Sequence, residues 1–209
     1  MKQGFVKVAS ATPRIRVADP VYNAQVICEQ AKEAAEHGAK IVVFPELCIT
    51  GYTCNDLFLQ ELLLEKAKEA LLTIVEETGQ LEALFLVGLP VDKDGRLYNV
   101  AAVLYRGRIL GMIPKKNIPM YAEFYEGRHF TPGEETVTEY RLGKQEIPFG
   151  TNLLFRCEEL PELILGCELC EDLWVAEPPS TSHALMGATV IANLSASNET
   201  VSKDDYRTL

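Results

Sequence analysis

The sequence has few basic residues and lacks long apolar segments, which argues against nucleic-acid binding and against membrane insertion. Twenty Lys and Arg stand against 30 Asp and Glu, which gives a formal net charge of −10. Without a basic cluster to displace counterions from a phosphate backbone, a nucleic-acid partner is disfavoured. No stretch approaches the roughly 18 apolar residues of a membrane span, and Lys7 interrupts any apolar leader. We therefore expect a cytoplasmic protein that binds neither nucleic acid nor membrane.

Cysteine and histidine are also scarce, with six Cys and three His in 209 residues. The cysteines show no regular framework, which favours reduced thiols over disulfides. Structural zinc needs about four soft ligands, usually in two close pairs, whereas the only near pair besides Cys167 and Cys170 is Cys48 and Cys54, and the histidines are scattered. Neither GxGxxG nor GxxxxGK[ST] occurs, so no dinucleotide fold and no P-loop is supported. We expect no metal and no cofactor in this chain.

Alternating strand and helix patterns at the start of the chain predict an α/β fold. Residues 4–9 alternate like a half-buried strand, and the helix that follows has Asp19 as its N-cap and Pro20 at its first position. A β-branched run at 41–46 and a second amphipathic helix within 55–79 repeat the pattern. The 47% of hydrophobic residues are evenly spread, which indicates one domain.

The pattern changes after residue 81. Residues 81–115 predict three consecutive antiparallel strands joined by the turns DKDG and RG. Residues 116–145 predict a long ordered loop, and loops of that length in a compact domain are usually functional. A buried strand at 163–169, a helix that begins behind Pro178 and Pro179, and a final strand at 189–197 complete the order. Mixed sheets with flanking helices follow.

The stretch LGCELCEDLW contains Cys167 and Cys170, which could be a redox pair, half of a zinc site, two buried thiols, or a nucleophile with a bystander. Residues three apart on a strand point to opposite faces, so the two thiols are not expected to meet. Cys167 lies inside the strand and is interpreted as a core residue. Cys170 ends the strand and precedes charged residues, a position where α/β proteins often place reactive groups.

A nucleophilic thiol needs a base and a group that stabilises the oxyanion. None of the three histidines is placed to suggest a dyad, and helix capping explains His37. Glu46 ends an apolar strand, where partial desolvation would raise its pKa toward the range of a general base. Lys115 follows another strand and could stabilise an oxyanion and lower the thiol pKa. Each has an alternative interpretation as an exposed charge in a loop.

With these residues in view, the sequence resembles the nitrilase (carbon–nitrogen hydrolase) superfamily, whose Glu-Lys-Cys set would fall on Glu46, Lys115 and Cys170. Four motifs resemble those of one branch of this superfamily, the N-terminal glutaminase domains of glutamine-dependent NAD+ synthetases. These motifs are GYTCNDLF, YAEFYEGRHF, CEDLWVAEPPS and NLSASNE. The resemblance implies a four-layer α-β-β-α sandwich with two mixed sheets. It also implies hydrolysis of the glutamine side-chain amide through a Cys170 thioester.

The resemblance assigns further residues. Glu126 matches a second glutamate of the superfamily, which would position Lys115. The backbone N–H of Glu171 would join Lys115 at the oxyanion. Five residues fall at glutamine-binding positions of the branch, with Lys203 expected to bind the α-carboxylate and Glu171 the α-ammonium. These residues are Tyr52, Tyr121, Glu171, Ser197 and Lys203.

The resemblance also implies what lies beyond this chain. Residues 1–209 would form a carbon–nitrogen hydrolase domain that is incomplete at its C-terminus, and no SGGxDS loop of a synthetase domain is present. ATP and Mg2+ are expected only in that separate synthetase domain, which would use the released ammonia to amidate deamido-NAD+. A homo-oligomer is expected. Two alternatives remain open, namely a related amidase for another small amide and a non-catalytic assembly module on the same fold.

Overall fold

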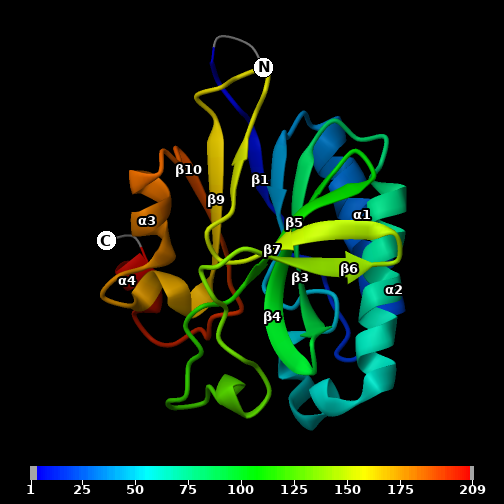
Figure 1. The fold of residues 1–209 in the computed structure, drawn as a ribbon, viewed down its shortest axis with the longest axis vertical. Helices are drawn as coiled ribbons and strands as arrows, with labels where there is room; N and C mark the ends of the chain where they lie inside the picture. Colours follow the sequence, from blue (N-terminus) through cyan, green and yellow to red (C-terminus); the bar gives the residue numbers. More distant parts are fainter. Residues whose placement is uncertain (1–3, 208–209) are drawn as a thin grey trace.

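The computed structural model describes residues 4–207. The first three and last two residues of the expected domain 1–209 therefore lie outside the described residues. In the described part of the chain, two sheets stack between helices (Figure 1). The order along the chain is β1 (Val8–Ser10), α1 (Pro20–Glu36), β2 (Ile41–Val43), η1 (Tyr52–Leu59), α2 (Glu61–Glu77), β3 (Leu84–Lys93), β4 (Arg96–Tyr105), β5 (Arg108–Pro114), η2 (Glu126–Arg128), β6 (Thr138–Leu142), β7 (Gln145–Phe149), β8 (Leu154–Arg156), β9 (Ile164–Leu169), η3 (Cys170–Trp174), α3 (Pro179–Leu185), β10 (Val190–Leu194) and α4 (Lys203–Arg207).

Both sheets are mixed. The larger has the order β1-β2-β3-β4-β5-β7-β6, in which β1, β2 and β3 run parallel and β3, β4 and β5 form an antiparallel meander. The smaller has the order β10-β9-β8, with β9 and β10 parallel. The α/β prediction with two mixed sheets is confirmed.

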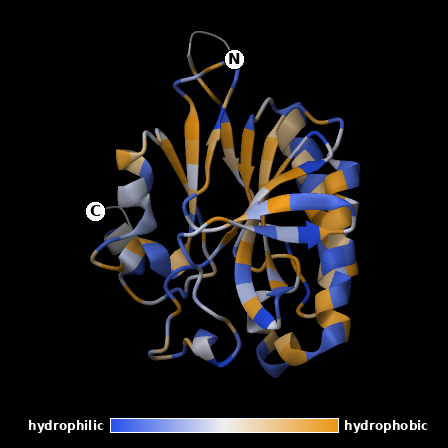
Figure 2. Cartoon of the chain, viewed as in Figure 1, coloured by the Kyte–Doolittle hydropathy of each residue, from blue (hydrophilic) through white to orange (hydrophobic). Residues whose placement is uncertain are grey.

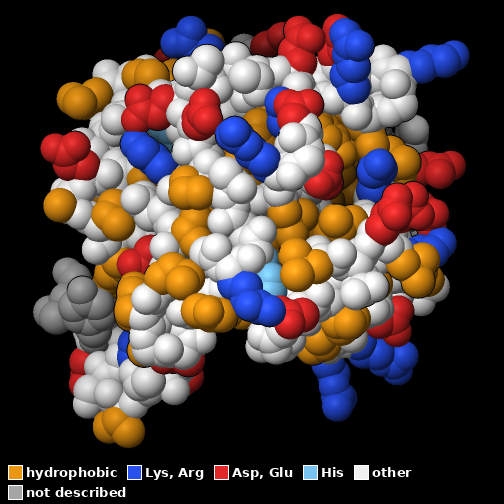
Figure 3. Space-filling model, turned by 60° about the horizontal axis from the view of Figure 1, so that its bottom comes forward, with side chains coloured by type: hydrophobic (Ala, Val, Ile, Leu, Met, Phe, Trp, Pro, Cys, Tyr) orange, Lys and Arg blue, Asp and Glu red, His pale blue; other side chains and the backbone are white. Residues whose placement is uncertain are grey.

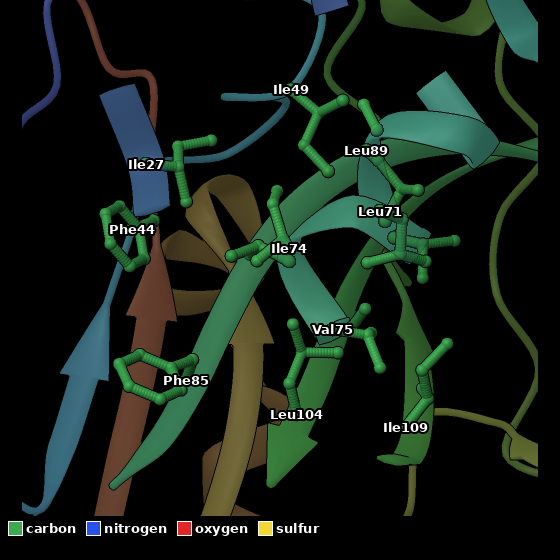
Figure 4. Close-up of a cluster of buried hydrophobic side chains, with 14 of the residues drawn as sticks. Ile27, Phe44, Ile49, Leu71, Ile74, Val75, Phe85, Leu89, Leu104 and Ile109 are labelled. Carbon is green, nitrogen blue, oxygen red and sulfur yellow. The ribbon is translucent and has the colours of Figure 1, made fainter. Parts of the chain in front are cut away.

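Helices α1 and α2 cover the outer face of the larger sheet, whereas α3 lies on the far side of β9 (Figure 1). The core between these helices and the sheet includes Ile27 of α1, Ile74 of α2 and Phe85 of β3 (Figure 4). A second core lies between the two sheets, where Cys167 of β9 packs with residues such as Val103 of β4. These two cores, together with the packing of α3 on β9, give the four layers α-β-β-α.

Hydropathy along the strands and helices agrees with this layering. Figure 2 shows hydrophobic residues concentrated in the central strands and on the sheet-facing sides of the helices. Figure 3 shows acidic and basic side chains interspersed over one face of the molecule. Among residues 4–207, none of the helices has the length and apolar composition needed to cross a bilayer.

Several predicted elements have different bounds in the structure. The N-terminal strand is only Val8–Ser10, and the final strand ends at Leu194 instead of continuing to residue 197. The helix expected within 55–79 is split into η1 and α2, because Gln60 between them has an extended backbone with φ −89° and ψ 118°.

The prediction of a long loop at 116–145 was wrong for the C-terminal end of that range. Thr138–Leu142 and Gln145–Phe149 form the hairpin β6-β7, which joins the edge of the larger sheet. Its signal is an alternation of buried residues, Tyr140 and Leu142 on one strand and Ile147 and Phe149 on the other. The irregular segment that reaches the candidate site is therefore shorter than expected.

Candidate active site

The candidate site is assembled from turns that follow β2, β5 and β9. Glu46 lies in the turn after β2, Lys115 directly follows β5, and Cys170 directly follows β9. Gly88 of β3 allows the first of these turns to pack against the sheet, because a Cβ there would lie 2.3 Å from the backbone nitrogen of Leu47. Glycine at this position thus lets Glu46 reach the interior.

Lys115 is held between two carboxylates. Its Nζ lies 2.7 Å from Oε1 of Glu46 and 2.6 Å from Oε1 of Glu126, and all three side chains are buried. The two carboxylates hold the pKa of Lys115 above its ordinary value despite the opposing effect of burial. The pKa of Glu46 is raised by burial, an effect that Lys115 opposes. The ammonium is therefore a fixed positive charge inside the protein.

Two further residues complete this buried network. Asn99 of β4 donates from Nδ2 to Oε1 of Glu46 at 2.7 Å and to Oε2 of Glu126 at 3.3 Å. The backbone N–H of Ala196 donates to Oε2 of Glu46 at 3.0 Å. Both oxygens of Glu46 are thus occupied by donors, as a buried carboxylate requires. Sequence reasoning missed Asn99, although a lone amide in the apolar strand LYNVAAVLY was a detectable signal.

Cys170 occupies a strained turn at the end of β9. Its φ is 42°, a left-handed conformation that non-glycine residues seldom adopt. The hydroxyl of Ser195 donates to Sγ at 3.4 Å. Burial and the charge of Glu46 raise the pKa of the Cys170 thiol to about 11, although Lys115 lowers it. Lys115 thus acts on the thiol pKa in the direction expected from the sequence, but burial and Glu46 outweigh it.

The turn after Cys170 is anchored by Asp172. Its carboxylate accepts from the backbone N–H groups of Leu169 at 3.0 Å and Asn117 at 2.7 Å. Asp172 is buried, and it ties the β9 turn to the segment that follows Lys115. It is a second residue that sequence reasoning missed, although it stands inside the quoted CEDLW motif.

A pocket of about 210 Å³ opens beside the thiol. Four of the five residues predicted to bind substrate line it with Cys170, and Tyr121 donates from its hydroxyl to Oε2 of Glu171 at 2.7 Å. Lys203 donates to Ser197 at 2.5 Å across the same pocket. The full lining is Pro119, Tyr121, Phe124, Cys170, Glu171, Trp174, Ser197 and Lys203. The pocket therefore presents a carboxylate and an ammonium near one thiol.

Tyr52 is placed differently from the other four. It does not line the pocket, and its hydroxyl donates to Oε1 of Glu126 at 2.7 Å. Burial and the charge of Glu126 raise the pKa of Tyr52, so the phenol stays protonated. Its observed contact is with the Lys115 network instead of with the pocket.

The remaining cysteines and histidines lie apart from the pocket. Cys167 is buried between the sheets, as expected for a core residue. His37 ends α1 with Nδ1 2.8 Å from the carbonyl of Glu33, which agrees with capping. Among residues 4–207, no group of three or more His, Cys, Asp and Glu side chains is arranged to hold a metal ion. A larger cavity of about 440 Å³ lies beside α2 and contains none of the predicted site residues.

The α-β-β-α fold, with Glu46, Lys115 and Cys170 brought together after β2, β5 and β9, is the arrangement expected for a nitrilase-type hydrolase. The comparison with known families agrees with this class. The carbon–nitrogen hydrolase family matches residues 7–207, and the chain belongs to this family. It is similar to the glutamine-dependent NAD(+) synthetase of Mycobacterium tuberculosis (strain ATCC 25618 / H37Rv), with 42% identity over 208 residues that cover 100% of this chain and 31% of that protein. The chain thus spans about a third of the length of the curated relatives it matches.

Comparison with solved structures agrees with the family assignment. A glutamine-dependent NAD(+) synthetase from Cytophaga hutchinsonii superimposes with a TM-score of 0.86 at 28% identity, and covers 97% of this chain and 32% of its own. An amidase from Nesterenkonia sp. superimposes with a TM-score of 0.70 at 21% identity, over 95% of this chain and 68% of its own. The second similarity shows a shared fold only. The nitrilase-type architecture expected from the sequence is confirmed.

Proposed function

We propose that this chain is the glutaminase domain of a glutamine-dependent NAD+ synthetase and hydrolyses the side-chain amide of L-glutamine to glutamate and ammonia. The observation that carries the proposal is the position of the Cys170 thiol, between the buried Glu46–Lys115–Glu126 network and a pocket with charges of both signs. Free glutamine is a small amide that carries an α-ammonium and an α-carboxylate. Glu171 and Lys203 offer the complementary charges.

The first half of the reaction forms a thioester. Cys170 Sγ attacks the amide carbon while Glu46 accepts the thiol proton, because a thiol with a pKa of about 11 is protonated at neutral pH. The ammonium of Lys115 and the backbone N–H of Glu171 hold the oxyanion of the tetrahedral intermediate. Glu46 then returns the proton to the leaving nitrogen, and ammonia departs.

The second half clears the enzyme. Glu46 removes a proton from water, which attacks the glutamyl thioester and forms a second tetrahedral intermediate. Collapse of this intermediate releases glutamate and returns the proton to Cys170. Burial raises the pKa of Glu46, which brings it closer to the operating pH and makes it a better proton shuttle. Glu126 and Asn99 keep the lysine and the base in place throughout.

The wider role is proposed from the names of the relatives and from the share of their length that this chain covers. We propose that the remaining two thirds of the protein include the ATP- and Mg2+-using synthetase domain, which consumes the ammonia to amidate deamido-NAD+ in a cytoplasmic homo-oligomer. The chain spans 31% of the Mycobacterium tuberculosis relative, which leaves room for such a domain. Neither ATP nor a metal has a role in the hydrolysis derived above.

The test measures ammonia release by the full-length protein from glutamine, asparagine and short aliphatic amides. We expect kcat/KM to be highest for glutamine, because only an α-amino acid of the right length uses both Glu171 and Lys203. An equal or higher kcat/KM for an aliphatic amide would support the related amidase and contradict the proposal. Absence of ammonia release, together with failure of a glutamine-like chloroketone to label Cys170, would instead indicate a non-catalytic module.

A further inference from the structure

One buried carboxylate plays no part in the mechanism above. Glu168 lies on β9, two residues before Cys170, and its side chain is 1% exposed. It is on the opposite face of β9 from Cys167, toward α3, and its Oε2 accepts the backbone N–H of Ser180 on α3 at 2.9 Å. A buried carboxylate is costly unless its oxygens are hydrogen-bonded. Its second oxygen therefore needs a donor.

That donor comes from the neighbouring strand. Asn193 of β10 is the direct partner of Glu168 in the parallel register, and its Nδ2 donates to Oε1 of Glu168 at 3.4 Å. A carboxylate oxygen accepts hydrogen bonds, so the amino side of the Asn193 amide must face Glu168. Glu168 thereby selects one of the two orientations of this amide and points its oxygen away.

The oriented amide binds the backbone of Cys170. Oδ1 of Asn193 accepts from the backbone N–H of Cys170 at 3.2 Å, and Nδ2 donates to the backbone oxygen of the same residue at 3.5 Å. These contacts hold the residue whose φ of 42° is left-handed. Turning the amide over would place its oxygen against a carboxylate and its amino group against an N–H. The correct orientation of Asn193 thus supports the strained turn.

We propose that Glu168 is a positioning residue for the nucleophile, and that it acts through Asn193 by fixing the backbone of Cys170. The same turn aims the thiol at the pocket and directs the N–H of Glu171 toward the oxyanion. The inference rests on the proposed function, in which Cys170 is the nucleophile. Neither Glu168 nor Asn193 lines the pocket, so the effect concerns turnover and not substrate affinity.

The test is a double-mutant cycle in the full-length protein, with Glu168→Gln, Asn193→Ala and the double variant. A glutamine side chain offers one acceptor oxygen where two donors are present, so the amide of Asn193 is no longer fixed. We expect Glu168→Gln to lower kcat for glutamine by about 10- to 100-fold with KM changed by less than about 2-fold, as expected for a misplaced catalytic group. In the Asn193→Ala background the same substitution should change kcat by less than about 2-fold.

A second readout does not depend on glutamine. The rate at which iodoacetamide alkylates Cys170, followed by peptide mass spectrometry, should show the same non-additive pattern. If the wild-type protein releases no ammonia from glutamine, the proposed function fails while this cycle still reports on Glu168. Should Glu168→Gln not fold, Asn193→Ala alone must still slow both reactions, and normal rates in that variant would overturn the proposal.

The matched control is His183→Gln. His183 is buried in the same layer beside β9, but its Nε2 pairs with the carbonyl of Thr151 at 2.9 Å. This variant disturbs a buried polar contact of α3 without touching Asn193, so we expect kcat within about 2-fold of wild type. Equal losses in His183→Gln and Glu168→Gln would show general loosening of α3. Equal effects of Glu168→Gln in both backgrounds would show that it does not act through Asn193. Either result would overturn the proposal.

Discussion

The ammonium of Lys115 lies 2.7 Å from Oε1 of Glu46, and neither side chain is accessible to solvent. A buried ion pair gives little net stability, because desolvation of both charges offsets their attraction. Its value in the proposed mechanism is chemical, since Lys115 favours the ionised form of Glu46, the proposed base, whose pKa burial would otherwise raise further. The pair also places a positive charge beside the Cys170 thiol, which would become an anion in the proposed reaction.

Replacement of Glu46 distinguishes its proposed role in proton transfer from the effect of its charge on the pKa of the Cys170 thiol. We expect Glu46→Gln to lower kcat for ammonia release by about 10²- to 10⁴-fold, the usual contribution of a general base. The negative charge of Glu46 raises the thiol pKa, so the same variant should shift the midpoint of the pH profile for Cys170 alkylation below about 11. Ammonia release is followed in steady state, and alkylation by mass spectrometry. An unchanged or higher midpoint would contradict the electrostatic assignment.

The two cysteines of CELC should respond oppositely. Cys170→Ala should abolish ammonia release and leave the stability nearly unchanged, because it removes the nucleophile from the edge of a pocket. Cys167→Ala should preserve kcat and lower the free energy of unfolding by about 1 kcal/mol through a small void between the sheets. Urea unfolding and ammonia assays on both variants check this. Activity in Cys170→Ala would refute the mechanism.

The two tyrosines that the sequence placed together at the substrate should differ as well. Tyr52→Phe removes a donor to Glu126, so we expect a lower kcat with little change in KM. Tyr121→Phe removes the donor that orients Glu171 in the pocket, so we expect mainly a higher KM for glutamine. Steady-state kinetics of the matched pair separate the two effects. A rise in KM confined to Tyr52→Phe would restore the original assignment of Tyr52 to the substrate.

Lys203 is expected to bind the α-carboxylate. Lys203→Met keeps the alkyl chain and removes the charge, so KM for glutamine should rise by about 10-fold or more, as for loss of a charge-assisted hydrogen bond. Lys116→Met is the control, since Lys116 pairs with Glu135 at the surface and does not line the pocket. A similar KM in both variants would remove Lys203 from the substrate site.

The fold was largely predictable because its signals are local. Asp19 and Pro20 mark the start of α1, and the turns at Asp94–Gly95 and Arg106–Gly107 join the predicted antiparallel strands. The missed hairpin β6-β7 has strands of only five residues, and Pro148 inside the second strand counts against a strand prediction. Periodicity detects buried elements better than edge elements.

Only those site residues that directly follow a predicted strand could be identified from the sequence pattern. Glu46, Lys115 and Cys170 each follow an apolar strand, which drew attention to them before any geometry was known. Asn99 and Asn193 were missed because their importance depends on which carboxylate lies opposite, Glu46 in one case and Glu168 in the other. Such partners are 53 and 25 residues away in sequence, and only the folded chain shows them.

The most direct test of the mechanism is acid quenching of the full-length protein during turnover of glutamine, followed by mass spectrometry of its peptides. We expect a glutamyl group on the peptide that contains Cys170, sensitive to hydroxylamine as a thioester is, and absent from Cys170→Ala. Turnover of glutamine with no adduct on Cys170, or with the adduct on Cys167, would contradict the central claim that Cys170 is the nucleophile.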